Sequence, residues 1–294
     1  MRVFLTGATG FIGSALVPEL LDAGHQVLGL SRSQAAAESL TAAGAQVQRG
    51  DLEDLDSLRR GAAESDAVIH CGFVHDFSRF AEVCEIDKRA IEALGSALVG
   101  SKRPLLVTSG TGMGTAGHGQ PATEDHFDPK HPNPRAGSEI AAAAMSARGV
   151  DVRVVRLPQV HDPVKQGLIT YLVSLAREKG SSAYIGEGRD RWPAVHRLSC
   201  AHLYRLALEK GSAGARYHAV AEEGVPIREI AEALGRGLKV PVVSKSLEEA
   251  PAHFGWMAMF AGMDMPASSA LTQQRLGWRP TGPGLISDLD AMKY

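Results

Sequence analysis

Three glycines near the N-terminus, Gly7, Gly10 and Gly13, separate a short apolar segment from a segment with helical periodicity. The apolar run at residues 3–5 is uninterrupted, which is typical of a strand buried on both faces of a parallel sheet. Apolar side chains then recur at helical spacing over residues 12–20. Glycines at such a junction permit a tight turn and a close approach of the backbone to an anion, which the free N–H groups of the helix start bind. The turn therefore predicts a phosphate-binding site.

The surroundings of this turn favour the same interpretation. A second strand is expected at residues 25–30, one helix after the turn, and it completes a βαβ unit. The alternative is an ordinary glycine-rich turn between strand and helix, because a lone glycine spacing is weak evidence. We favour a nucleotide site since the strand before the turn and the helix after it are both predicted.

Short apolar runs and helical segments alternate through the first half of the chain. Further helices are expected near 34–43, up to about 60, and over 80–99 and 136–147, and further strands at 45–48, 67–70, 104–108 and 152–156. Such alternation implies parallel strands joined by right-handed crossovers. The sequence therefore predicts an α/β fold with a doubly wound parallel sheet of the Rossmann type, in which ligands bind beyond the carboxyl ends of the strands.

The alternation ends after Leu157 and Pro158. Residues 1–160 are expected to form a dinucleotide-binding core. Residues 161–294 carry several prolines between short helical segments, as a smaller substrate-binding lobe would. One strand of this second part, predicted at 216–220, is expected to return to the core sheet.

Bulk properties narrow the class of protein. The chain has 294 residues and a formal net charge of −2, so nothing in its charge favours a nucleic acid or an anionic membrane as partner. Three widely spaced cysteines argue against a disulfide framework or a zinc site and suit a reducing cytoplasm. The first glycine comes too early for a signal peptide, and no apolar stretch of about 18 residues occurs. We expect a soluble, cytoplasmic protein without a metal site.

Five motifs follow one another at suitable intervals along the chain. They are Thr6-Gly-Ala-Thr-Gly-Phe-Ile-Gly13, Gly50-Asp-Leu52, His70-Cys-Gly72, Thr108-Ser-Gly110 and Val195-His-Arg197. By these motifs the chain resembles the extended short-chain dehydrogenase/reductase superfamily, specifically its atypical members of the NAD-dependent epimerase/dehydratase type. The resemblance extends over nearly the whole length and implies a nicotinamide dinucleotide as coenzyme and a small molecule as substrate.

The resemblance also implies which residues contact the coenzyme. The glycine turn would hold the pyrophosphate, two residues after the third strand would contact the adenine, and the segments after the fourth and sixth strands would lie near the nicotinamide. The coenzyme-binding residues expected in this way are Gly7, Thr9, Gly10, Phe11, Ile12, Asp51, Leu52, Cys71, Gly72, Phe73, Thr108, Leu157, Pro158, Gln159 and Val160.

The end of the second strand selects between NAD and NADP. An NAD enzyme typically has an acidic residue there, which binds the ribose hydroxyls. This chain has Ser31, Arg32 and Ser33 instead, and a guanidinium between two hydroxyls suits a 2′-phosphate. We therefore expect a preference for NADP, with NAD as the alternative coenzyme. The competing interpretation of Arg32 is a solvated arginine without a ligand.

The Tyr-x-x-x-Lys pair of the family, which transfers the proton to the substrate carbonyl, is absent from this sequence. Alignment of the helix start places Arg135 at the tyrosine position and Glu139 at the lysine position. Arginine does not act as an acid near neutral pH, but it is able to donate hydrogen bonds to a developing oxyanion. The alternative is a surface ion pair between Arg135 and Glu139, four residues apart on one helix.

Other side chains near the strand ends are candidates for catalysis. Ser109 matches the Ser/Thr position of the family and would polarise a substrate carbonyl, as would Thr108 or Thr111 if the loop turns inward. His75 follows the fourth strand and is a candidate acid/base. Asp76 is expected beside the substrate. The alternatives are that the hydroxyls cap nearby backbone and that the histidine is solvated.

A segment of the second lobe is also expected at the substrate. Arg191 and Trp192 lie where extended members of the family place a basic residue and a strand that lines the substrate cleft. The alternatives are a surface arginine and a core tryptophan. An aromatic and methionine-rich stretch at residues 254–263 would roof an apolar pocket, or would belong to a core or subunit contact.

Together these features predict an NADP-dependent oxidoreductase of a small, apolar or weakly polar substrate. A redox sensor that binds the dinucleotide without turnover is one alternative, and a nucleotide-sugar epimerase or dehydratase is another. The predicted helices 80–99 and 136–147, with the alanine run 141–144, also suggest a homodimer.

Overall fold

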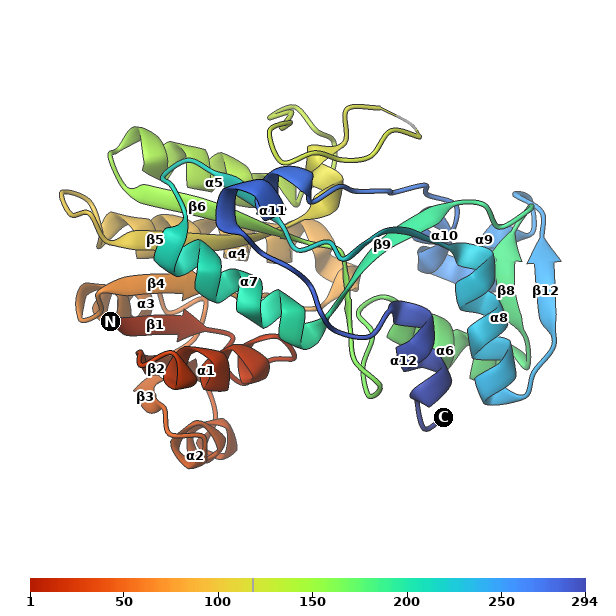
Figure 1. Cartoon of the computed structure of the whole chain (residues 1–294), viewed down its shortest axis with the longest axis horizontal. Helices are drawn as coiled ribbons and strands as arrows, with labels where there is room; N and C mark the ends of the chain where they lie inside the picture. The colour runs from red at the N-terminus through yellow and green to blue at the C-terminus, as the bar shows by residue number, and fades with distance from the viewer. Residues whose placement is uncertain (118) are drawn as a thin grey trace.

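A computed structural model describes residues 1–117 and 119–294 of the chain. Its centre is a seven-stranded sheet with the strand order β10-β6-β5-β4-β1-β2-β3, in which every neighbouring pair is parallel (Figure 1). The strands are β1 (Arg2–Thr6), β2 (Gln26–Ser31), β3 (Gln46–Arg49), β4 (Ala67–His70), β5 (Pro104–Gly110), β6 (Asp151–Leu157) and β10 (Arg216–His218). The predicted doubly wound α/β sheet is confirmed.

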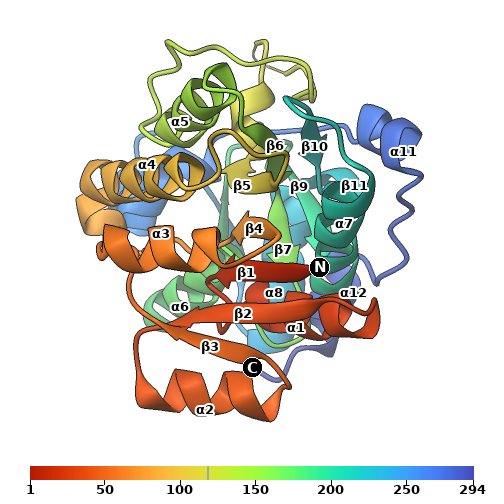
Figure 2. The same cartoon turned by 90° about the vertical axis from the view of Figure 1, so that its left-hand side faces the viewer.

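Helices cover both faces of this sheet (Figure 2). One face carries α3 (Leu55–Ala63), α4 (Phe80–Ser96) and α5 (Ala136–Ala147), and the other carries α1 (Gly13–Asp22) and α7 (Arg197–Lys210). The helix α2 (Gln34–Ala42) packs on the edge strands β2 and β3. Each face buries its own apolar cluster, so the strands are apolar on both sides, as the uninterrupted runs in the sequence require.

A second lobe follows the sheet along the chain (Figure 1). A three-stranded sheet, β11 (Glu222–Pro226), β9 (Arg191–His196) and β7 (Gln159–His161), leads into it, and the two-stranded sheet β8 (Ser182–Ile185) and β12 (Val242–Lys245) lies within it. Its helices are α6 (Ile169–Lys179), α8 (Ile227–Leu238), α9 (Ala250–Phe254), α10 (Ala258–Ala261) and α12 (Leu285–Ala291). A third apolar cluster, with Trp192 at 0% exposure, forms the core of this lobe.

Parts of residues 161–294 belong spatially to the first unit. Strand β10 pairs with β6 at the edge of the main sheet, and α7 packs against α1. The helix α11 (Ala270–Leu276) is followed by Trp278, which is buried in the same cluster as α7. The smaller lobe is therefore built from the segments on either side of α7 and β10 rather than from one continuous stretch.

Short 3₁₀ helices in the described part of the chain are η1 (Phe77–Arg79), η2 (Thr111–Gly114) and η3 (Gly255–Met257). Two of them, η1 and η2, follow the carboxyl ends of β4 and β5, where chain segments that contact ligands are expected. Within the described residues, no helix is long and apolar enough to span a membrane.

Candidate active site

The glycine turn after β1 has the geometry that a dinucleotide requires. Gly7 has a φ of 69°, a conformation that side chains disfavour, and a Cβ at Gly13 would lie 2.0 Å from the carbonyl oxygen of Gly7. The N–H groups of Phe11 and Ile12 make no hydrogen bond with any residue that the structure describes, and the first turn of α1 holds no acidic side chain. Unpaired donors at a helix start fit the diphosphate of the coenzyme.

The residues expected at the adenosine end lie together at the ends of β2 and β3. The Ser33 side chain caps α2 by accepting a hydrogen bond from the N–H of Ala36 at 3.2 Å, and the Ser31 hydroxyl donates to the Ser33 carbonyl. Arg32 is 74% exposed, and its Nε lies 3.6 Å from Oδ2 of Asp51. Arg32 is thus an accessible cation held loosely next to the predicted adenine contact.

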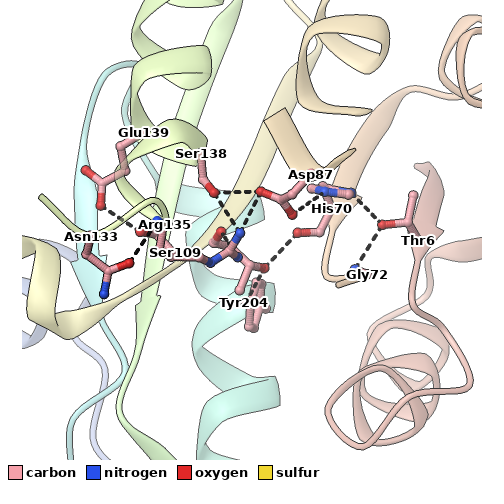
Figure 3. A network of polar contacts seen from close by, with 11 residues as sticks. Thr6, His70, Gly72, Asp87, Ser109, Asn133, Arg135, Ser138, Glu139 and Tyr204 are labelled. Atoms are coloured by element: carbon pink, nitrogen blue, oxygen red, sulfur yellow. Dashed lines mark hydrogen bonds and ion pairs between the residues drawn. The ribbon is translucent and has the colours of Figure 1, made fainter. Parts of the chain in front are cut away.

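The ends of β1 and β4 are joined by buried hydrogen bonds (Figure 3). Oγ1 of Thr6 accepts from the N–H of Gly72 at 3.1 Å and lies 2.8 Å from Nδ1 of His70. Nε2 of His70 lies 3.2 Å from Oδ1 of Asp87 on α4. A carboxylate only accepts hydrogen bonds, so Nε2 carries the proton that His70 donates to Asp87.

Arg135 immediately precedes α5, and its guanidinium is anchored by three partners. Nη1 donates to Oδ2 of Asp87 at 2.6 Å and to Oγ of Ser138 at 2.7 Å, and Nη2 donates to the carbonyl of Thr108 at 3.0 Å (Figure 3). The guanidinium carbon lies 4.2 Å from the centroid of the Phe73 ring. One N–H of Nη2 and the N–H of Nε have no partner among the described residues, and the side chain keeps 14% exposure. Arg135 is therefore a fixed cation with donors to spare.

Asp87 is the buried counter-ion of this arginine, with 1% side-chain exposure. Burial alone would raise the pKa of Asp87, but the charge of Arg135 and the hydrogen bonds from His70 and Ser138 outweigh it and lower the pKa to about 2. The carboxylate is ionised at neutral pH and holds the guanidinium in one orientation.

Glu139 belongs to a separate buried network. Its carboxylate accepts from Nε and Nη2 of Arg156 at 2.7 and 2.8 Å, from Nε of Arg216 at 2.8 Å, and from Oγ of Ser109 at 2.8 Å. Burial opposes its charge, but Arg156 and Arg216 hold the pKa of Glu139 below its usual value. Arg135 and Glu139 therefore do not form the surface ion pair that was the alternative, because each has a different buried partner.

The chain is similar in sequence and structure to known proteins. The model of the NAD dependent epimerase/dehydratase family matches residues 3–221. The chain belongs to this family. It is 50% identical over 295 residues to the uncharacterized protein C2A9.02 of Schizosaccharomyces pombe, with 100% of both chains covered. It is 28% identical to the 2-alkyl-3-oxoalkanoate reductase of Stenotrophomonas maltophilia, over 84% of this chain and 78% of that one.

A solved structure supports the same fold. The DesIV double mutant, a dTDP-glucose 4,6-dehydratase of Streptomyces venezuelae with NAD and DAU bound, matches with a TM-score of 0.78 at 22% identity, over 100% of this chain and 96% of that one. The family resemblance and the NAD(P)-binding Rossmann fold predicted from the five motifs are thus confirmed. In parallel α/β sheets of this kind ligands bind beyond the carboxyl ends of the strands, and the turn at Gly7 and the ends of β4 and β5 lie at that edge of the sheet.

Several residues predicted for catalysis in this epimerase/dehydratase chain have other partners. Ser109 is 3% exposed and its hydroxyl donates to Glu139, so its proton is already engaged. Thr108 donates to the carbonyl of His70 and contacts the Tyr204 hydroxyl, each at 2.7 Å. Tyr204 is fully buried, so its hydroxyl is not accessible to a substrate, and burial raises its pKa. Thr111 is buried at the start of η2.

Asp76 and His75, the two site residues predicted in the loop after β4, have different surroundings. Asp76 caps η1, where it accepts hydrogen bonds from Ser78 and from Nε of Arg79, so its carboxylate is occupied on its own loop. His75 packs edge-on against Phe73, with ring centroids 5.5 Å apart. Desolvation by its neighbours and the charges of Lys165 and Arg135 lower the pKa of His75, and its imidazole is neutral at pH 7.

In the second lobe, the residues predicted to contact the substrate have protein partners instead, as the alternative interpretations expected. Trp192 is fully buried in the core of that lobe and is not available to a ligand, which corrects the substrate prediction. Arg191 pairs with Asp264 through Nη2 at 2.7 Å and Nε at 3.0 Å. Near β7, Oε1 of Gln159 accepts from the N–H of Leu168 and fixes the start of α6, and Val160 is buried.

A row of aromatic rings links the two lobes. Phe77 of η1 stacks on Trp256 of η3 with centroids 5.1 Å apart and an interplanar angle of 15°. Tyr171 of α6 packs edge-on against both rings, and Trp256 contacts Phe260. The sequence predicted that the stretch 254–263 covers an apolar pocket. It did not indicate Phe77 and Tyr171, because only the fold brings these residues next to that stretch.

Proposed function

We propose that this protein reduces the carbonyl group of a small apolar substrate, with NADPH preferred over NADH, and that Arg135 replaces the tyrosine of the family as the donor to the carbonyl oxygen. The observation that carries the proposal is the guanidinium of Arg135, which is fixed by Asp87 and Ser138 and stacked on Phe73. In our alignment of the helix start, Arg135 corresponds to the tyrosine of the family. The family membership and the 28% identity to an oxoalkanoate reductase support a reductive activity.

The glycine turn, Arg135 and His75 have separate roles in the proposed reaction. The turn at Gly7 to Ile12 would hold the diphosphate of the coenzyme, which supplies the hydride when bound. Arg135 stabilises the negative charge that develops on the carbonyl oxygen through its unpaired N–H groups. A guanidinium does not release a proton near neutral pH, so the proton of the product alcohol comes from solvent. His75 is our candidate to relay it, because a neutral imidazole gives a proton at one nitrogen as it accepts one at the other.

Asp87 acts through Arg135 and is a positioning residue. A bidentate or multiply anchored guanidinium has few orientations, and the buried Asp87 selects one of them. Because His70 and Ser138 also donate to Asp87, its carboxylate stays ionised while Arg135 interacts with a substrate. The two carboxylate oxygens thus hold Arg135 on one side and the end of β4 on the other.

An apolar substrate fits the side chains of the second lobe. Trp256, Met259 and Met263 are 48%, 61% and 39% exposed, and the stretch 255–263 has no charged residue. Three cations of the second lobe that would suit a nucleotide sugar are paired: Arg189 with Glu187, Arg191 with Asp264 and Lys245 with Glu249. These pairs favour a carbonyl reductase over the epimerase or dehydratase alternative.

The NADP preference rests on the end of β2. Arg32 has an exposed guanidinium beside Ser31 and Ser33, and Arg49 of β3 reaches the same turn by donating to the Ser33 carbonyl. Two arginines at the predicted 2′-phosphate position support NADP, with NAD as the alternative.

The homodimer remains a prediction of the sequence. Ala141 and Ala142 of α5 are buried within the chain, while Ala143 and Ala144 are exposed. Half of the alanine run is therefore available to a second protomer, and light scattering of the purified protein distinguishes a monomer from a dimer.

The activity is tested by following the oxidation of NADPH and NADH with a panel of aliphatic and aromatic aldehydes and ketones. We expect turnover with apolar carbonyl compounds and a loss of kcat in Arg135→Lys. Binding of both coenzymes without consumption of either would favour the sensor alternative. Interconversion of a nucleotide sugar without net coenzyme oxidation would favour an epimerase. Either of these outcomes, without carbonyl reduction, would overturn the proposal.

A further inference from the structure

The turn between β7 and α6 places a basic side chain of the second lobe over the glycine turn. Asp162 shapes this turn: its Oδ1 accepts the N–H groups of Val164 and Lys165, both at 2.8 Å, and its own N–H donates to the carbonyl of Lys165 at 3.0 Å. Asp162 is only slightly exposed. The conformation that presents the Lys165 side chain is therefore fixed by partly buried hydrogen bonds.

Arg197, at the start of α7, ties this turn to α1. Nη1 donates to Oδ2 of Asp162 at 2.9 Å, and Nη2 donates to Oγ of Ser14 at 2.9 Å. The guanidinium carbon lies 5.0 Å from the centroid of the Phe11 ring. Because Ser14 and Phe11 belong to the turn and first helical residues that hold a phosphate in this fold, Arg197 anchors the second lobe at that position.

Lys165 lies beside the same ring but has no ionic partner. Its Nζ is 5.8 Å from the centroid of Phe11, and the ion pairs of the described residues do not include it. Its charge also reaches His75, where it contributes to a lowered pKa. The ammonium group is thus located between the phosphate turn and the loop after β4, and it is held by a weak cation–π contact that a stronger anionic partner would replace.

We propose that Lys165 binds the diphosphate of the dinucleotide coenzyme, so that the second lobe closes the phosphate site of the first. The inference rests on the coenzyme site of the proposed function. The glycine turn offers N–H groups and the partial charge of a helix start, but the first turn of α1, Gly13-Ser-Ala-Leu16, contains no basic residue. A diphosphate carries two negative charges, and an unpaired ammonium supplies a full charge and up to three donors.

The assignment to Lys165 rather than Arg197 follows from their contacts. Both ends of the Arg197 fork are engaged, by Asp162 and Ser14, so it holds the turn in place. Lys165 is exposed and has a flexible stem, which allows its Nζ to move from the ring to the phosphate. Coenzyme binding would in this way join the two lobes through a single side chain.

The test measures equilibrium binding of NADPH, NADH, ADP-ribose and 5′-AMP by calorimetry to the wild-type protein and to Lys165→Met. We expect about tenfold or greater loss of affinity for the dinucleotides and for ADP-ribose, all of which contain the diphosphate. We expect no more than a twofold change for 5′-AMP, which has a single phosphate. Lys165→Arg should retain most of the affinity, and Lys210→Met, at the exposed end of α7, should match the wild type.

Each other result counts against the inference. Equal dinucleotide affinity in Lys165→Met and wild type would overturn it while the coenzyme site stands. Equal losses for 5′-AMP and the dinucleotides would place the lysine at the adenosine 5′-phosphate alone instead of at both phosphates, and unchanged ADP-ribose binding would place it at the nicotinamide. Either result would overturn the assignment to the diphosphate as a whole. No binding of either dinucleotide to the wild type would overturn the coenzyme site as well. Thermal melting of each variant separates these outcomes from misfolding.

Discussion

Arg135 and Glu139 are four residues apart at the start of α5, and each forms an ion pair with a buried partner. The Glu139 and Arg156 side chains are both 0% exposed, and the Glu139 carboxylate accepts further hydrogen bonds from Arg216 and Ser109. In the other pair Asp87 is buried, but Arg135 keeps 14% exposure and has two N–H groups without a partner among the residues that the structure describes. We call Glu139 and Arg156 the closed pair, because both side chains are fully buried. We call Asp87 and Arg135 the open pair, because the arginine is partly exposed near the end of β5.

This difference separates a structural pair from a chemical one. A fully enclosed ion pair contributes to the fold chiefly because removal of one partner leaves an uncompensated buried charge. A buried carboxylate that fixes a partly exposed cation produces a preorganised donor, which is the requirement for stabilising a developing oxyanion. Arg135 and Glu139, which our alignment places at the two positions of the family's Tyr-x-x-x-Lys pair, therefore differ in their surroundings, and we assign a chemical role only to Arg135.

The largest effect is expected at the closed pair. Glu139→Gln leaves the guanidinium of Arg156 buried without a counter-ion, so the free energy of unfolding should fall by about 3–5 kcal/mol. Urea denaturation measures this. As a control, Glu64→Gln removes an exposed pair with Arg2 and should change stability by less than about 0.5 kcal/mol. A change at Glu139 as small as that at Glu64 would erase the distinction between the two pairs.

A substitution in the open pair should lower the turnover number and leave coenzyme binding nearly unchanged. Arg135→Lys keeps the positive charge but loses the planar fork, so kcat should fall about 100-fold, equivalent to roughly 2.7 kcal/mol of transition-state stabilisation, while coenzyme affinity stays within twofold. Steady-state kinetics and coenzyme titration measure both quantities.

Asp87→Asn tests the coupling within the open pair. If Asp87 acts by positioning Arg135, the double variant Asp87→Asn with Arg135→Lys should lose no more activity than Arg135→Lys alone. Additive losses would show that Asp87 has an independent role, and kcat within twofold of wild type in Arg135→Lys would remove the arginine from the mechanism.

The pH dependence of stability should also distinguish the open pair. The pKa of Asp87 is lowered to about 2 in the folded protein, against about 3.9 for an unperturbed aspartate. Its contribution is therefore complete above pH of about 4 and is lost as the pH falls toward 2, a difference on the order of 2 kcal/mol. Thermal melting should show the advantage of the wild type over Asp87→Asn shrinking across this window. A constant difference would contradict the assigned ionisation.

The smallest effect concerns coenzyme choice at the exposed Arg32. Arg32→Asp should weaken NADPH binding by about tenfold or more, because it replaces the donor to the 2′-phosphate by a repelling carboxylate. NADH binding should change little, and the exposed Arg189→Asp should alter neither. Calorimetry measures each affinity, and equal losses for both coenzymes would refute the NADP assignment.

Much of the fold was predictable because its signals are local. The strand at 67–70 and the helix at 136–147 match their predicted bounds, since alternating apolar runs and helical periodicity are set by neighbouring residues. Other predicted ends shifted by up to a few residues, as for α4, which ends at Ser96 instead of 99. Hydrogen bonds at the ends of elements depend on side chains that periodicity does not describe.

The candidate site was predictable only in part. The sequence placed Arg135 at the tyrosine position, but Asp87, 48 residues away, had no recognisable motif. Ser109 matched a family position, yet its hydroxyl is engaged by Glu139. Trp192 offered the same apolar signal as Trp256, and only burial distinguishes a core tryptophan from one at the surface.

The sequence by itself determined the order of strands and helices and the glycine turn at Gly7, because backbone conformation and binary patterning depend on residues a few positions apart. The tertiary structure decided which carboxylate holds Arg135, which cations surround Glu139, and that Lys165 of the second lobe lies beside Phe11. Such contacts join residues tens of positions apart. They depend on how the parallel sheet and the second lobe bring chain segments together, which no local pattern encodes.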